Sequence, residues 1–261
     1  MCRFDPKIHV VIEGAEFADY FWPAVEQYVE CTHEYWRSNG KFTPNITLRL
    51  ASGGYIGGGL YHSQNLEGAL TTLPGARIVC PSFADDAAGL LRTSMRSKGF
   101  TLYLEPKALY NSVEAAAVVP EEFEVPFGKA RIRREGTDLT IITYGNTTHF
   151  CLDVAERLAR EGVGSVEVID LRSLIPLDKE AIFASVRKTG KVMVVHEDKV
   201  FSGFGAEIAA QIAGEMFRYL DAPVQRVGST FTPVGFNPIL ERAILPNDEK
   251  IYKAAKELLE F

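Results

Sequence analysis

His62 is the residue whose place in this sequence of 261 residues most favours chemistry. It follows a glycine-rich stretch, residues 53–59, and stands where a helix is expected to begin. An imidazole at such a place reaches a cleft and exchanges a proton near neutral pH. A histidine whose ring only packs within the fold is the alternative. The residues by themselves make His62 a candidate catalytic residue and leave its role open.

Two aromatic residues, Phe17 and Tyr20, follow an expected strand at residues 9–12. Open α/β sheets bind ligands at the carboxyl ends of their strands, so both residues are candidates for contact with a ligand. The helix expected after them carries apolar residues at helical spacing, which favours a place in the core instead. The pattern alone favours the core.

The glycines of residues 53–59 match neither common phosphate-binding loop, because no Lys-Ser or Lys-Thr follows them and the Rossmann spacing is wrong. We expect them to let the backbone fold tightly or approach a ligand. A second group, His196 and Glu197 with the loop 202–205, predicts either an anion site at a helix N-terminus or a tight turn at a subunit contact. The turn is favoured because no set of cations accompanies the loop.

Composition excludes several classes of protein. A net charge of −6 repels a polyphosphate backbone, so we expect no nucleic-acid partner. No apolar run approaches the roughly 20 residues that a membrane helix needs, and no signal peptide is recognisable, so we predict a cytoplasmic protein without a membrane contact. The cysteines lie far apart without a C-x-x-C pair, which predicts reduced, buried thiols at Cys2, Cys31, Cys80 and Cys151.

Strands and helices alternate in two parts of the chain, and these parts must position the candidate residues. The first part has expected strands at 9–12, 47–50, 77–80 and 101–104, with helices at 19–37, after Ser63 and at 82–98. The second has expected strands at 139–144, 166–171, 192–196 and 223–227, with helices from Thr147 or Thr148, at 178–190 and at 205–220. Such alternation is typical of parallel sheets. We predict an α/β fold with two parallel-sheet α/β domains, 1–110 and 137–261, joined by an ordered linker, 111–136.

Several motifs, in order over nearly the whole chain, resemble one family. They are FADYFWPAVEQ (17–27), Tyr-His-Ser-Gln (61–64), Glu-Pro-Lys-Ala-Leu-Tyr (105–110), and the segments 168–178 and 196–205. The chain is similar to the beta subunits of thiamine-diphosphate-dependent 2-oxo acid dehydrogenases, which decarboxylate branched-chain 2-oxo acids or pyruvate. The resemblance implies a partial pyrimidine-binding domain followed by a transketolase C-terminal-like domain.

The resemblance also implies a shared cofactor site. In this family an alpha subunit holds the diphosphate through magnesium, the beta subunit receives the aminopyrimidine, and the acyl group passes to a lipoyl acyltransferase core. Tyr20 resembles the aromatic residue that packs on the aminopyrimidine, and His62 resembles the active-site histidine. Glu16 stands where many relatives have glutamine, which places an acidic side chain near the cofactor pocket. No residue of this chain is assigned to a metal.

Two departures from the family predict an incomplete enzyme. The glutamate that activates the aminopyrimidine lies upstream of FADY in relatives, in a segment absent here, so we expect an N-terminally truncated chain. No Gly-Asp-Gly motif for diphosphate and magnesium occurs, so an alpha subunit or a fused alpha part must supply it. We therefore expect no activity from the chain alone.

The predicted function is oxidative decarboxylation of branched-chain 2-oxo acids, such as 2-oxoisovalerate, because the motifs at 61–64 and 105–110 resemble the branched-chain enzymes more closely. Pyruvate dehydrogenase is the nearest alternative. An alternative of another class is a non-catalytic module, in which residues 136–261 dimerise and dock the acyltransferase core. The expected assembly is a homo-oligomer or an alpha2-beta2 tetramer.

Overall fold

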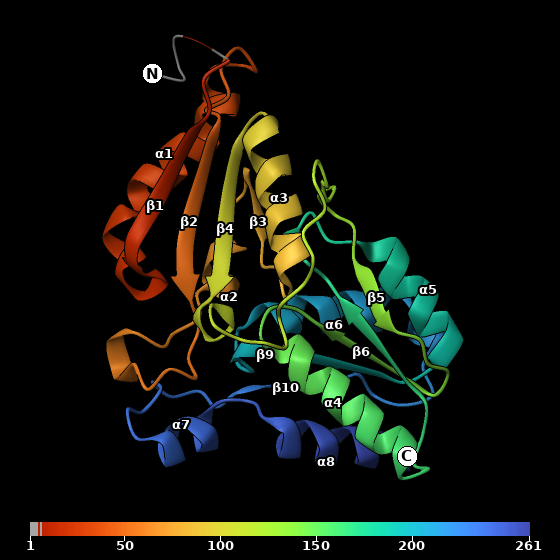
Figure 1. Cartoon of the computed structure of the whole chain (residues 1–261). Coiled ribbons are helices and arrows are strands. Elements are labelled where there is room, and N and C mark those ends of the chain that lie inside the picture. The colour runs from red at the N-terminus through yellow and green to blue at the C-terminus, as the bar shows by residue number, and fades with distance from the viewer. Residues whose placement is uncertain (1–4, 6) are drawn as a thin grey trace.

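The computed structural model describes residue 5 and residues 7–261, with the backbone alone at Ala15 and Glu16. The chain forms two mixed sheets with helices on both faces of each, and Figure 1 shows the first sheet standing above the second. Both sheets have five strands, four of them parallel and one antiparallel at the edge. The predicted fold, two α/β domains, is confirmed.

The first sheet has the order β1-β2-β4-β3-β8. Its strands are β1 (Val10–Phe17), β2 (Ile46–Ser52), β3 (Ala76–Val79), β4 (Phe100–Pro106) and β8 (Ser173–Ile175). Its helices are η1 (Ala18–Ala24), α1 (Val25–Arg37), η2 (Gly59–Tyr61), α2 (Glu67–Leu70), α3 (Ala84–Arg96) and η3 (Lys107–Leu109).

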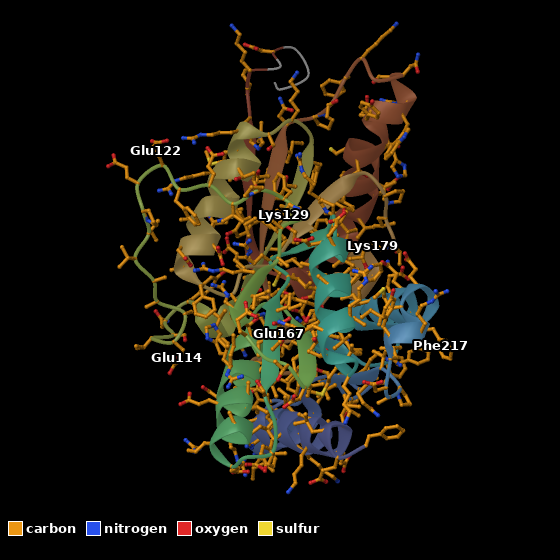
Figure 2. The ribbon with its side chains drawn as sticks, turned by 90° about the vertical axis from the view of Figure 1, so that its right-hand side faces the viewer. Glu114, Glu122, Lys129, Glu167, Lys179 and Phe217 are labelled. Atoms are coloured by element: carbon orange, nitrogen blue, oxygen red, sulfur yellow. The ribbon has the colours of Figure 1, made fainter. Side chains whose placement is uncertain are left out.

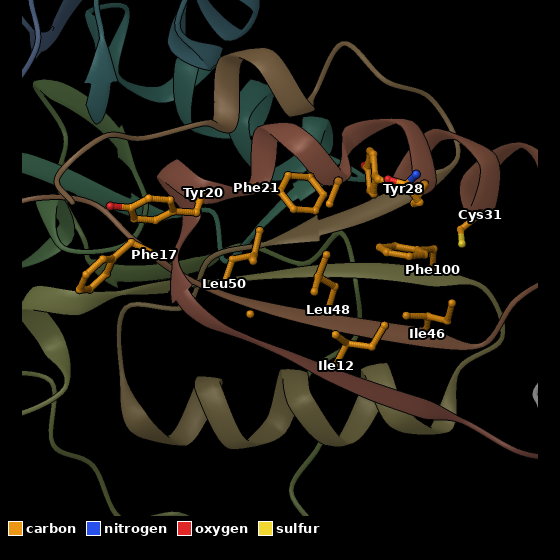
Figure 3. A pocket seen from close by; sticks show the side chains of 13 residues that line it. Ile12, Phe17, Tyr20, Phe21, Tyr28, Cys31, Ile46, Leu48, Leu50 and Phe100 are labelled. Carbon is orange, nitrogen blue, oxygen red and sulfur yellow. The ribbon is translucent and has the colours of Figure 1, made fainter. Parts of the chain in front are cut away.

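Alternation along β2 and β4 gives the first sheet two faces. Leu48 and Leu50 point toward η1 and α1 and pack in one core with Phe21. Tyr103 faces α3, where its hydroxyl donates to the carbonyl of Ala87 at 2.6 Å. The sheet therefore lies between α1 and α3, as Figure 3 also shows.

The second sheet has the order β10-β9-β6-β7-β5. Its strands are β5 (Arg131–Arg134), β6 (Leu139–Thr143), β7 (Val166–Asp170), β9 (Val192–Lys199) and β10 (Gln225–Ser229). Its helices are α4 (Thr147–Arg160), α5 (Lys179–Thr189), α6 (Phe204–Glu215), η4 (Phe217–Tyr219), α7 (Pro238–Ile244) and α8 (Asp248–Leu259). The strands β6 and β7 are buried along their whole length, as expected for strands covered by helices on both faces.

One hydrophobic core extends through both domains. Helices α5 and α6 cover one face of the second sheet through Ile182 and Ile208, and this core is continuous with the α1 face of the first sheet. Helices α4 and α8 cover the opposite face through Leu158 and Leu258. The two domains therefore form one packed body.

Four strands and α-helices were not predicted from the sequence: β5, β8, α7 and α8. Strand β5 lies within the segment proposed as a linker and pairs antiparallel with β7, and β8 follows β7 in the chain but pairs with β3 of the first sheet. Helix α8 packs on α4 near the C-terminus. The rest of the segment 111–130 lies on an outer flank, where Figure 2 places Glu114 and Glu122 on the side away from Phe217. None of the described helices is long and apolar enough to span a membrane.

Candidate functional site

The structure brings Tyr20 and His62 together at the carboxyl ends of the first-sheet strands. The Tyr20 hydroxyl lies 3.3 Å from Nε2 of His62, and the two rings are 5.4 Å apart. The Phe17 ring meets the imidazole edge-on at 4.7 Å on the same site. Tyr20 is 45% exposed and His62 is half-buried, so both face a ligand-accessible surface. The two side chains that were predicted to lie together are therefore in contact.

Lys107, at the start of η3, is a fourth member of the site, and the sequence did not single it out. Its Nζ donates to the backbone carbonyl of His62 at 2.7 Å and lies 4.1 Å from the Phe17 ring centroid. Burial lowers the pKa of Lys107 to about 8, and the nearby carboxylates of Asp19 and Glu197 oppose that shift. The only sequence signal was its place in the motif at 105–110, just after a strand.

The second domain holds the loop that carries His62. Glu197 accepts from the backbone N–H of Gly54, and Asp198 Oδ2 accepts from the N–H of Gly68 at 2.9 Å. Both acids lie in β9, so the end of this strand fixes both ends of the loop. Neither of the two interpretations of the His196–Glu197 segment included this contact.

Helix α7 and its C-terminal flank hold the middle of the same loop. Glu241 accepts from the N–H of Gly57 at 3.2 Å, and the Tyr55 hydroxyl donates to the carbonyl of Pro246 at 2.7 Å. Glycine is required where the loop passes closest to the second domain. Gly53 has φ +87°, and a Cβ there would stand 2.5 Å from the Glu197 carboxylate. Tight folding of the backbone, one of the two roles expected for these glycines, therefore agrees with the packing at Gly53.

A small polar cavity lies behind this loop, between the two domains. It is bordered by Ser52, Glu67 and Tyr144, and a polar atom of each has no hydrogen-bond partner among the described residues. Burial, together with the charge of Asp198, raises the pKa of Glu67 to about 8. Burial likewise raises the pKa of Glu197 to about 7, although the Gly54 N–H opposes the shift. The carboxylates near the His62 loop therefore retain protons to unusually high pH.

His196 does not belong to the cleft. Its ring is fully buried, parallel to the ring of Tyr144 and close to Gly203 and Gly205. Burial lowers the pKa of His196 to about 4, which keeps the imidazole neutral. This histidine packs the turn between β9 and α6. Two of the predicted buried thiols, Cys80 and Cys151, also lie in the core. Cys31, predicted to be buried as well, is only half-buried, and Cys2 is outside the described residues.

An apolar groove of about 400 Å³ starts at Phe17 and Tyr20 and runs between α1 and the first sheet. Figure 3 shows these two rings at one end and Tyr28, Cys31 and Phe100 at the other. An exposed aromatic face beside an imidazole fits a flat heterocycle such as an aminopyrimidine. Among the residues that the structure describes, no cluster of three or more acidic, histidine or cysteine side chains suits a metal ion.

Glu16 lies in β1, one residue before Phe17, but its side chain is outside the described part of the chain. Its predicted contact with the cofactor therefore stays a prediction.

Comparisons with known proteins agree with the fold. Residues 7–113 match the transketolase pyrimidine-binding domain family, and residues 128–251 match the transketolase C-terminal domain family. The chain is 40% identical to the 2-oxoisovalerate dehydrogenase beta subunit of Bacillus subtilis, over 96% of this chain and 76% of that protein. It is 39% identical to the pyruvate dehydrogenase E1 beta subunit of the same organism, over 87% of this chain and 69% of that protein.

A solved structure of a split-gene transketolase, an inactive beta4 tetramer, superimposes with a TM-score of 0.73 at 21% identity. The superposition covers 96% of this chain and 75% of that one, and it supports the fold. The two domain families and the two dehydrogenase relatives together identify the function at the level of the family. The chain belongs to the beta subunits of the thiamine-diphosphate-dependent 2-oxo acid dehydrogenase E1 components.

Proposed function

We propose that this chain supplies the pyrimidine side of the active site in a dehydrogenase for branched-chain 2-oxo acids, with 2-oxoisovalerate as a substrate. The observation that carries the proposal is the contact between the Tyr20 hydroxyl and His62 Nε2 at the mouth of an apolar groove. This contact places the Tyr20 ring, which can stack on a flat heterocycle, beside the His62 imidazole, which can transfer protons.

Tyr20 and His62 have distinct roles in this proposal. The ring of Tyr20 packs against the aminopyrimidine, and its hydroxyl orients the imidazole through Nε2. His62 exchanges a proton with the reacting oxygen of the substrate and with the lipoyl group that accepts the acyl chain. When bound, thiamine diphosphate supplies the electron sink that decarboxylation needs. Glu16, one residue before Phe17 in the sequence, is assigned to the same pocket in this proposal.

An alpha subunit, or a fused alpha part, completes the site in this proposal. It holds the diphosphate through magnesium, for which the described residues offer no cluster of ligands. The names of the relatives, each a subunit beta, support such pairing. The acyl group then passes to a lipoyl acyltransferase core, and the assembly contains two copies of this chain, alone or with two alpha subunits.

The branched-chain substrate rests on the motifs at 61–64 and 105–110 and on the 40% identity to a 2-oxoisovalerate dehydrogenase subunit. Pyruvate is the nearest alternative, because a pyruvate dehydrogenase subunit is 39% identical.

The test is decarboxylation of 2-oxoisovalerate and of pyruvate by this chain with its alpha partner, thiamine diphosphate and magnesium. We expect a higher kcat/KM for 2-oxoisovalerate, and no activity without the alpha partner. His62→Ala should lower kcat by about 10²–10⁴, the usual contribution of a general acid or base. His33→Gln, on α1, is the matched control and should leave kcat unchanged. A His62→Ala variant with full activity would refute the proposed site.

A non-catalytic assembly module is the second candidate, and an exposed apolar surface supports it. Ala210, Ala213 and Phe217 lie on the outer side of α6 and η4, and Phe217 is 77% exposed. A chain that dimerises and binds an acyltransferase domain, but decarboxylates neither substrate with any alpha partner, would establish this function instead.

A further inference from the structure

We propose that Lys107 is a positioning residue, which fixes the imidazole of His62 by holding both the backbone of His62 and the ring of Phe17. The inference rests on the proposed function of His62, but the positioning itself is measurable without turnover. Nothing in the motif comparison assigns a task to this lysine.

The ammonium group of Lys107 contacts two independent parts of the site. Nζ donates to the carbonyl oxygen of His62 at 2.7 Å, which restrains the backbone where the glycine loop ends. The same Nζ lies 4.1 Å from the Phe17 ring centroid, in the geometry of a cation–π contact. Phe17 in turn meets the imidazole edge-on at 4.7 Å. One cation therefore holds the histidine through its main chain and through its aromatic neighbour.

Lys107 acts through His62 in this proposal, because its side chain is only 6% exposed while its Nζ contacts the His62 backbone. A buried ammonium group is expensive unless charges and hydrogen bonds compensate it. Two carboxylates do so from different elements, Asp19 of η1 and Glu197 of β9. Asp19 also accepts the N–H of Gln64 at 3.0 Å, two residues beyond His62. The lysine thus lies at the centre of contacts that reach the His62 loop from three directions.

The loop itself contributes little regular structure that would fix the imidazole. Between Gly53 and Leu66 only the short turn η2 is helical, and three of the glycines have positive φ. His62 Nε2 has one described partner, the hydroxyl of the exposed Tyr20, at 3.3 Å. Replacing Lys107 removes the hydrogen bond to the His62 carbonyl and the cation beside the Phe17 ring. The imidazole can then sample other orientations.

The first experiment uses the full chain without cofactor. The rate at which diethylpyrocarbonate modifies His62 is measured by peptide mass spectrometry in the natural protein and in Lys107→Met. We expect the rate at His62 to rise about tenfold, the factor that corresponds to ~1.4 kcal/mol, because loss of the hydrogen bond to a charged donor frees the loop. The rate at His33 should stay unchanged. Amide hydrogen exchange in α4 and α8 reports whether the rest of the fold is intact.

The second experiment measures decarboxylation with the alpha partner. Lys107→Met should lower kcat about tenfold with little change in KM, because the lysine orients the acting group rather than binding the substrate. Lys107→Arg, which keeps the charge and a donor, should regain most of the loss in both assays. If Lys107→Met fails to fold, Lys107→Gln replaces it, since the amide keeps a donor and removes the charge.

The two assays separate failure of this inference from failure of the proposed function. A Lys107→Met protein whose His62 is modified at the natural rate, with exchange in α4 and α8 unchanged, would overturn the positioning role. Loss of kcat without recovery in Lys107→Arg would also count against it. A complex that decarboxylates neither substrate, while the modification rates change as expected, would refute the proposed function and keep the positioning role.

Discussion

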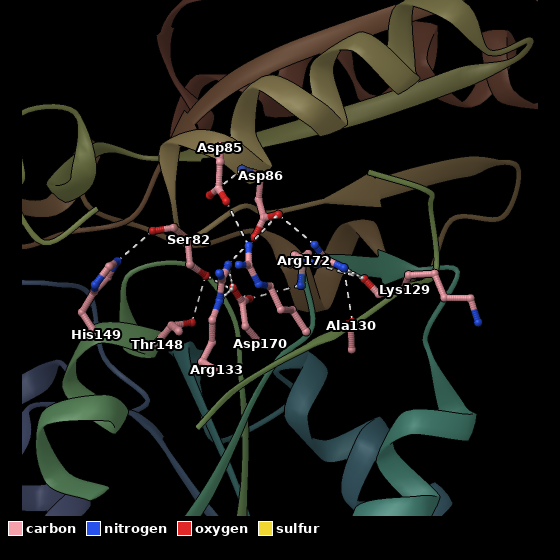
Figure 4. A network of polar contacts seen from close by, with 11 residues as sticks. Ser82, Asp85, Asp86, Lys129, Ala130, Arg133, Thr148, His149, Asp170 and Arg172 are labelled. Atoms are coloured by element: carbon pink, nitrogen blue, oxygen red, sulfur yellow. Dashed lines mark hydrogen bonds and ion pairs between the residues drawn. The ribbon is translucent and has the colours of Figure 1, made fainter. Parts of the chain in front are cut away.

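Two polar clusters are buried where the domains meet, and they differ in how their charges are matched. The first, called here the ion-pair cluster, contains Asp86, Asp170, Arg133 and Arg172 (Figure 4). Arg133 Nε donates to Asp170 at 3.0 Å, and Arg172 Nη1 donates to Asp86 at 2.8 Å. Ser82 also donates to Asp170 at 3.0 Å. Each carboxylate thus faces a guanidinium, and the cluster joins α3 to β5 and β7.

The second, called here the acid cluster, contains Glu67, Glu197 and Asp198. Glu67 accepts from the side-chain amide of Asn65 at 3.0 Å. Glu197 and Asp198 accept from the backbone N–H groups of Gly54 and Gly68 rather than from guanidinium groups. Burial raises the pKa of all three acids. The comparison teaches that carboxylates paired with guanidinium groups join the domains, whereas the acids that accept mainly from N–H groups lie beside the loop that carries the candidate catalytic residue.

Removing one carboxylate from the ion-pair cluster should have the largest effect. Asp86→Ala leaves two buried guanidinium groups with a single remaining carboxylate, so we expect the free energy of unfolding to fall by about 3–5 kcal/mol. Chemical denaturation measures it. Glu257→Ala, which breaks an exposed pair on α8, is the control and should change stability by no more than about 0.5 kcal/mol. If Asp86→Ala lowers the free energy of unfolding by less than about 1 kcal/mol, the ion-pair cluster does not fix the domains as proposed.

The acid cluster should make stability depend on pH in a defined direction. The folded chain keeps Glu67 protonated up to a pKa of about 8, whereas the group ordinarily releases its proton near 4.5. Between pH 4.5 and about 8 the folded state therefore binds more protons than the unfolded state. The contribution of Glu67 to the free energy of unfolding consequently falls as the pH rises through this range. Glu67→Gln should flatten this fall and be more stable than the natural protein at pH 9, by at least about 2 kcal/mol.

Denaturation of both proteins from pH 5 to pH 9 measures that difference. Glu156→Gln, on the exposed side of α4, serves as the control and should follow the natural protein. Identical pH profiles for Glu67→Gln and the natural chain would show that Glu67 is not held protonated by the fold.

Added side-chain volume at Gly205 should displace His196 and thereby disturb the acid cluster without changing any charge. A Cβ at Gly205 would lie 2.2 Å from the ring of His196. His196 directly precedes Glu197 in β9. We expect Gly205→Ala to lower the free energy of unfolding by about 1–3 kcal/mol, the usual cost of overpacking. Gly214→Ala lies in the same helix with open space around its Cβ and should be neutral or more stable by up to about 1 kcal/mol. Equal effects at the two glycines would contradict the close packing.

The edge of the ion-pair cluster should contribute least. Arg131 pairs with Asp85 at 2.9 Å, but its side chain is 45% exposed. Solvent screens such a pair, so Arg131→Ala should cost less than about 1 kcal/mol. A double-mutant cycle with Asp85→Ala measures the coupling between the two residues. A coupling above about 2 kcal/mol would show that the matched cluster extends to the surface.

The sequence predicted the alternation of strands and helices because apolar runs and helical periods are local features. It predicted less at the edges of the sheets. Strands β5 and β8 are short, and they pair antiparallel with β7 and β3, which are distant in the sequence. Their assignment depends on pairing rather than on their own residues. Helix α8, with Ile251, Ala255 and Leu258 on its buried side, did carry a local pattern that the prediction overlooked.

The types and order of the residues determined two domains, the family, and the candidates Tyr20 and His62. Only the tertiary structure decided which groups surround them. The Lys107 contact joins residues 45 positions apart, and the bond from Gly54 to Glu197 joins residues 143 positions apart. Such contacts arise when two sheets pack against one core, so no local period or motif encodes them. The physical reason is that hydrophobic burial selects the arrangement of the domains, and that arrangement then sets the charges around each polar group.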